Sequence, residues 1–124
     1  MIVSYNKEQH LSQLQKWWEQ WHLSAYSLEL LSETGLIIPE TACMFLYETN
    51  SPIILFENLV CNRELSDIDR DNAVNSLVRA GKIIAKNKGF KMIMLTTNNK
   101  SILKRAEQDG SYPAEQFYIV FRGV

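Results

Sequence analysis

The chain has 124 residues, of which 46% are hydrophobic and 22% are charged, a balance typical of a single soluble globular domain. No apolar run approaches the roughly 20 residues that a membrane-spanning helix needs, and the N-terminus has no signal-peptide pattern. Two cysteines and two histidines are too few for an ordinary zinc site, so we expect reduced thiols, no metal and a cytoplasmic location.

The net charge of −1 conceals an uneven distribution of charge along the chain. Residues 1–71 carry four basic side chains against eleven acidic ones, whereas residues 72–106 carry eight basic side chains and no acidic one. Such segregation indicates either an anionic partner, such as nucleic acid or an acidic protein, or a solvated lysine-rich surface. No nucleic-acid-binding motif favours nucleic acid independently of the charge.

The first half of the chain predicts short strands around one clear helix. Residues 2–5 predict a strand, and Asn6 with Gln9 predicts a capping box for a helix that ends near Trp21. Residues 26–31 predict a short second helix or an ordered loop. Three antiparallel strands are predicted over residues 36–38, 42–48 and 53–60, the last two joined by a turn at residues 50–52.

The second half predicts longer alternation of helix and strand. Ser66 predicts the cap of a helix whose apolar stripe runs over residues 74–85, and Gly89 predicts its left-handed end. Residues 92–95 are wholly apolar and predict a central strand buried on both faces. A last helix and a last strand are predicted over residues 101–108 and 116–122.

The resulting order, β-α-(α)-β-β-β-α-β-α-β, predicts one mixed α/β domain over residues 1–124, with an antiparallel meander followed by a right-handed crossover into parallel pairing. This order resembles that of the GNAT superfamily of acyl-CoA-dependent N-acyltransferases, and in particular the small GNAT-like proteins that bacteriophages encode. The segments that carry the resemblance are Trp17-Trp18, Gly35-Leu36-Ile37, Phe45-Leu46-Tyr47-Glu48-Thr49 and Phe56-Glu57-Asn58-Leu59-Val60.

The resemblance implies that acetyl-CoA binds where two neighbouring strands of the sheet diverge. The pantetheine arm would pair with the backbone of the fourth strand at Leu59, Val60 and Cys61. Glu57, on the same strand, would be the general base that deprotonates the acceptor amine, because partial burial can raise its pKa. The alternative is that Glu57 faces solvent or pairs with a lysine.

The resemblance also implies that the pyrophosphate lies on backbone N–H groups at the start of the following helix. Arg70, Asn72 and Ala73 match part of the family's pattern there. Ser66 and Asp69, however, predict that the helix begins before Arg70, with acidic residues around its first turns. An acid-capped helix start with no ligand is the alternative.

Further cofactor contacts would come from the basic residues and from the segment after the fifth strand. Lys82 and Lys86 lie on one stripe of a helix with Arg79 and could hold the phosphoadenosine end of CoA. Asn99 matches the family's Asn near the cofactor arm, while Ala106 stands where the family has a proton-donating tyrosine. We therefore expect any transferase activity to be slow.

Three tryptophans lie within five residues, at Trp17, Trp18 and Trp21, so they cannot all face the core equally. At least one should line a pocket or a partner surface; the alternative is that all three pack in the core with one partly exposed edge. Two hypotheses for function follow. One is an N-acetyltransferase acting on an amine of a small molecule or protein; the other is a catalytically silent phage GNAT-like protein that binds a host protein or nucleic acid through its basic and Trp-rich surfaces. Either would be a monomer or a homodimer.

Overall fold

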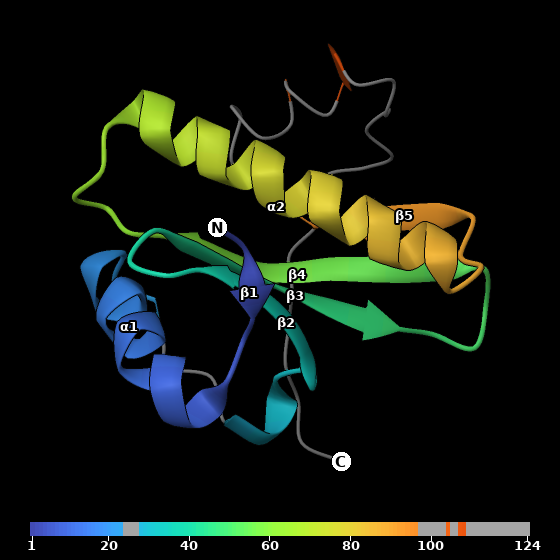
Figure 1. Ribbon diagram of the computed structural model, residues 1–124, viewed down its shortest axis with the longest axis horizontal. Helices are drawn as coiled ribbons and strands as arrows, with labels where there is room; N and C mark the ends of the chain where they lie inside the picture. The colour runs from blue at the N-terminus through green and yellow to red at the C-terminus, as the bar shows by residue number, and fades with distance from the viewer. Residues whose placement is uncertain (24–27, 97–103, 105–106, 109–124) are drawn as a thin grey trace.

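The computed structural model describes residues 1–23, 28–96, 104 and 107–108. In this part of the chain, five strands form one mixed sheet in the order β1-β2-β3-β4-β5 (Figure 1). β1 to β4 pair antiparallel, and β4 pairs in parallel with β5, which confirms the meander and the parallel pairing. The strands are β1 (Val3–Ser4), β2 (Thr34–Ile38), β3 (Ala42–Glu48), β4 (Ile53–Cys61) and β5 (Met92–Leu95).

The predicted last helix and last strand lie outside the described residues, apart from positions 104, 107 and 108, which are helical. Of the segment 26–31, the structure describes a single turn of 3₁₀ helix, η1 (Leu28–Leu30). No helix in the described ranges is long and apolar enough to cross a membrane.

Helix α1 (Lys7–Gln20) begins at Asn6, whose side chain accepts hydrogen bonds from the backbone N–H groups of Glu8 and Gln9. A capping box also predicts a hydrogen bond from the Asn6 N–H to the side chain of Gln9, and this prediction is wrong. The Asn6 N–H donates instead to Nδ1 of His10, at 2.9 Å. The His10 ring is buried beside Tyr5, with 5.9 Å between the ring centroids, and this packing brings Nδ1 to the start of the helix.

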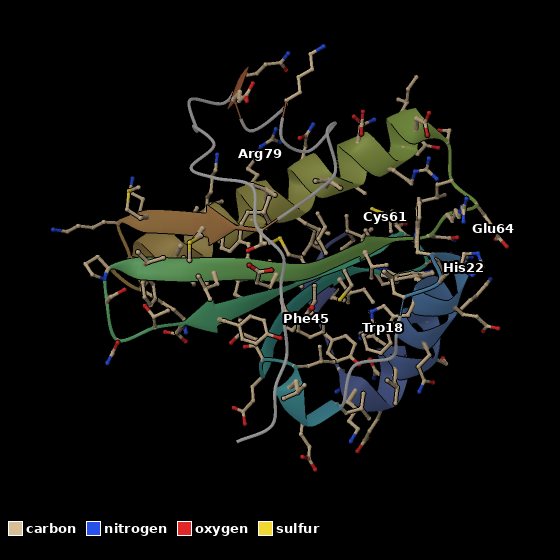
Figure 2. The ribbon with its side chains drawn as sticks, turned by 180° about the vertical axis from the view of Figure 1, so that it is seen from behind. Trp18, His22, Phe45, Cys61, Glu64 and Arg79 are labelled. Carbon is tan, nitrogen blue, oxygen red and sulfur yellow. The ribbon has the colours of Figure 1, made fainter. Side chains whose placement is uncertain are left out.

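α1 covers one face of the sheet and buries two of the three tryptophans, Trp17 (1% exposed) and Trp18 (3% exposed). Figure 2 shows Trp18 and Phe45 in the layer between α1 and the sheet. The residues of this layer, the α1-side core, are Leu14, Trp17, Trp18, Ile37, Cys43, Phe45 and Val60.

Helix α2 (Asp67–Asn87) covers the opposite face (Figure 1). It begins at Ser66, whose Oγ accepts from the Asp69 N–H at 3.2 Å, and it is followed by Gly89 with φ of 87°, as predicted. Its buried stripe packs on alternate residues of β2, β3 and β4. The α2-side core consists of Leu36, Ala42, Met44, Leu46, Ile54, Phe56, Ala73, Leu77 and Ala85.

The prediction that β5 is buried on both faces is wrong for the described part of the chain. Ile93 and Leu95 pack against the α2-side core, but Met92 and Met94 are 53% and 47% exposed. β5 is the last strand of the described sheet, and α2 covers only one of its faces. The apolar run therefore does not require two covered faces.

Candidate active site where β4 and β5 diverge

The two parallel strands pair over only four residues. Ile53–Phe56 of β4 lies beside Met92–Leu95 of β5, and β4 then continues to Cys61 while its other edge stays paired with β3. Within the described residues, the edge of β4 that faces away from β3 has no strand partner beyond Phe56. An unpaired strand edge offers backbone N–H and C=O groups to an extended ligand. The three residues predicted to bind the pantetheine arm, Leu59, Val60 and Cys61, lie on this segment.

One backbone group of that segment is already used. The indole Nε1 of Trp21 donates a 2.7 Å hydrogen bond to the Cys61 carbonyl. Trp21, at the end of α1, is half-buried, whereas Trp17 and Trp18 are buried. The guanidinium groups of Arg63 and Arg70 lie 4.9 and 5.4 Å from the centre of its ring, a cation–π arrangement. These contacts fix the end of α1 against the end of β4.

Glu57 is the first residue of β4 beyond the last pair with β5. Its carboxylate is half-buried, and its Oε1 accepts a 2.9 Å hydrogen bond from Oγ1 of Thr96, the residue directly after β5. Burial raises the pKa of Glu57 above its ordinary value of 4.5, while hydrogen bonds from Thr96 act in the opposite direction. The predicted base thus lies directly beyond the last residue pair of β4 and β5, with a raised pKa.

A β-bulge directly follows Glu57, and the sequence analysis missed it. Phe45 pairs with Glu57 but Cys43 pairs with Val60, so β4 has one extra residue opposite Met44. Asn58 is left-handed in this bulge, with φ of 56°. The spacing of Phe56 and Leu59 carried the signal: both pack on the α2-side core although they lie three residues apart, which an unbroken strand does not allow.

The start of α2 does not present the backbone N–H groups that the resemblance implies for a pyrophosphate. The helix begins at Asp67, so Asn72 and Ala73 lie in its second turn, where their N–H groups face carbonyls of the preceding turn. The side chain of Arg70 donates to the Arg63 carbonyl at 3.0 Å and pairs with the Asp67 carboxylate. The start of α2 therefore does not form this phosphate site, whereas the edge of β4 beyond Phe56 stays a candidate for the pantetheine arm.

The remaining predicted residues lie elsewhere. Lys82 and Lys86 are exposed on the C-terminal half of α2. Lys86 is 19 residues beyond Asp67, about 28 Å along the helix axis at 1.5 Å per residue. The structure therefore separates these lysines from the helix start instead of gathering them there. Asn99 and Ala106 lie outside the described residues, so their roles stay predictions.

The two cysteines form no disulfide with each other, and they face opposite sides of the sheet. Burial raises the pKa of Cys43 to about 12, which keeps it a protonated and unreactive thiol. Cys61 is half-buried. The described residues hold no group of three or more side chains that could bind a metal.

Solved acetyltransferases share this fold. The structure superposes over 98% of the chain on 99% of an acetyltransferase from Trypanosoma brucei, with a TM-score of 0.69 and 11% identity. It superposes over 98% on 98% of glucosamine-6-phosphate N-acetyltransferase from Arabidopsis thaliana, with a TM-score of 0.64 and 12% identity. It also superposes over its full length on 99% of an aminoglycoside N-acetyltransferase, AAC(6')-Iy, in complex with CoA, with a TM-score of 0.60 and 17% identity.

At these identities the match concerns the fold, and the chain has the mixed α/β fold of the GNAT acetyltransferases. No protein-family model and no curated protein sequence matches the chain.

Proposed function

We propose that this chain, which has the fold of GNAT acetyltransferases, transfers an acetyl group from a pantetheine thioester such as acetyl-CoA to an amine. The observation that carries the proposal is the position of Glu57. A half-buried carboxylate with a raised pKa lies directly beyond the last residue pair of β4 and β5, beside the edge of β4 that has no strand partner among the described residues. A perturbed acid at such a place is a candidate for general-base catalysis.

In the proposed reaction, the thioester supplies an electrophilic carbonyl. The edge of β4 over Leu59–Cys61, apart from the Cys61 carbonyl that Trp21 already occupies, holds the pantetheine amides by strand-like pairing and places the thioester carbonyl near Glu57. Glu57 takes a proton from the amine as its nitrogen attacks that carbonyl. Thr96 holds the carboxylate by donating to Oε1, which fixes the direction in which the other oxygen points.

The leaving thiolate has no assigned proton donor, because alanine stands at position 106. General-acid help is worth about 10²–10⁴-fold. We therefore expect turnover below the roughly 1 s⁻¹ at which ordinary enzymes begin. The resemblance to proteins encoded by bacteriophages, the acceptor and any host partner stay predictions.

The test measures acetyl transfer to a panel of a polyamine, an aminoglycoside and peptides with a free N-terminus. The acetylated product should be followed by mass spectrometry, because the half-buried Cys61 can react with thiol reagents. Transfer by the wild type that becomes much slower in Glu57→Gln but is kept in Glu33→Gln, a matched change at an exposed position, supports the proposal. No transfer to any amine, with no binding of acetyl-CoA by calorimetry, would overturn it.

A further inference from the structure

Two side chains outside the predicted site connect the bulge after Glu57 to the segment that precedes β2. The side-chain amide of Asn58 donates a 2.7 Å hydrogen bond to the Tyr47 hydroxyl. That hydroxyl in turn donates to the carbonyl of Leu30 at 2.9 Å. The chain of bonds therefore runs from β4 through β3 to η1, across residues that are far apart in the sequence.

The bulge sets the faces of the residues that follow Glu57 on β4. Phe56 packs on the α2-side core and Glu57 points to the other face, while beyond the bulge Leu59 returns to the α2 side and Val60 to the α1-side core. Without the extra residue, Leu59 and Val60 would exchange faces, because side chains alternate along a strand. The packing of Leu59 and Val60 on the two cores thus depends on one left-handed residue, Asn58, which directly follows Glu57.

A left-handed conformation costs an ordinary L-residue about 1–2 kcal/mol. Asparagine tolerates it better than most residues, and the bond from its amide to Tyr47 offsets part of the cost. Because Asn58 directly follows Glu57, the same bond also limits rotation of the backbone that carries the carboxylate. Tyr47 is half-buried, which keeps competing water from much of this bond.

We propose that Tyr47 and Asn58 are positioning residues, which hold the bulge directly after Glu57 and so keep the Glu57 carboxylate beside Thr96, and which tie the bulge to η1. The inference rests on the proposed function for its catalytic consequence. Its structural part, the control of the Glu57 environment, is independent of that function.

Three variants distinguish the effect of losing the hydrogen bonds from the effect of straining the left-handed backbone at Asn58. Tyr47→Phe removes the hydroxyl and keeps the ring. Asn58→Gly removes the amide but accepts the left-handed conformation freely, and Asn58→Ala removes the amide and adds the strain. The readouts are the titration of the Glu57 side-chain carboxyl by ¹³C NMR and the separate values of kcat and KM. Thermal unfolding checks that each variant is folded.

We expect Tyr47→Phe and Asn58→Gly to shift the titration midpoint of Glu57 in the same direction. Both should lower kcat about 10-fold or more, because the Glu57 carboxylate is misplaced. The KM for the thioester donor should change little. The double variant should be no worse than Tyr47→Phe alone, because Tyr47→Phe already removes the bond from Asn58 as well as the bond to Leu30. A wild-type midpoint and kcat in both folded variants, or effects that add fully, would overturn the proposal. If the wild type transfers no acetyl group, the proposed function fails, and the NMR titration still decides whether Tyr47 and Asn58 control Glu57.

Discussion

Gly81 of α2 lies directly on the ring of Phe56, the last residue of β4 that pairs with β5. A Cβ placed on Gly81 would lie 2.8 Å from Cζ of Phe56 and 3.1 Å from the terminal methyl carbon of Met44. The helix can approach the sheet this closely only because position 81 has no side chain. The contact therefore determines how closely α2 packs on the sheet at Phe56, where the pairing of β4 with β5 ends.

This contact makes Gly81→Ala destabilising although alanine favours helices. We expect overpacking to cost about 1–3 kcal/mol, which exceeds the gain of about 1 kcal/mol in helix propensity. Chemical denaturation measures the change. In Phe56→Leu, which removes the ring atoms that meet the new methyl, the added effect of Gly81→Ala should shrink or reverse. Equal effects in both backgrounds would show that the ring does not limit position 81.

The structure changes the expectation for how a CoA donor is recognised. The start of α2 carries Asp67 and Asp69, and Arg70 is paired with Asp67. Acetyl-CoA should therefore bind no more than a few-fold more tightly than S-acetylpantetheine, which lacks the nucleotide. Asp67→Asn should strengthen binding of acetyl-CoA a few-fold, since one charge at a helix start is worth about 0.3–1 kcal/mol, and leave S-acetylpantetheine unchanged.

Calorimetric titration of acetyl-CoA and of S-acetylpantetheine into the wild type and into Asp67→Asn measures these affinities. A salt series is the control for electrostatics. A large preference for acetyl-CoA would contradict the expectation, as would a strong loss in Lys82→Glu with Lys86→Glu. Either result would mean that this chain binds the phosphates of CoA strongly, which the paired Arg70 and the acidic start of α2 do not predict.

The raised pKa of Glu57 also predicts how stability depends on pH. The folded state binds the Glu57 proton more tightly than the unfolded state, whose value is near 4.5. The contribution of Glu57 is therefore most favourable below that value and is lost as the pH rises through the folded pKa. Glu57→Gln, which carries no charge, should unfold at a higher temperature than wild type at about pH 7. This advantage should vanish near pH 3, and a less stable Glu57→Gln at neutral pH would be contrary to this account.

Much of the fold could be predicted from local signals. Asn6, Ser66 and Gly89 mark the helix ends by their capping chemistry, and the apolar runs of β3 and β5 have the predicted bounds. These features depend on neighbours within a few residues. The position of Glu57 at the divergence came from the family resemblance, which supplied the order of strands that periodicity alone leaves open.

The rest depends on contacts between distant parts of the chain. The bond from Trp21 to the Cys61 carbonyl joins residues 40 apart, and no sequence pattern encodes it. The partner of the Asn6 N–H is His10 because of packing against Tyr5, which capping rules do not include. The bulge at Asn58 is different, because the three-residue spacing of Phe56 and Leu59 on one face could have predicted it.

The most direct test of Glu57 as the base is the pH dependence of kcat/KM for acetyl transfer to the best amine of the panel. The wild type should lose activity on the acid side with an apparent pKa above 4.5, because only the ionised carboxylate accepts a proton. Thr96→Val removes a bond that favours the ionised form, so it should move this acid limb to higher pH. A folded Glu57→Gln should lack the limb and retain only slow transfer, and the same limb and rate in Glu57→Gln as in the wild type would contradict the account.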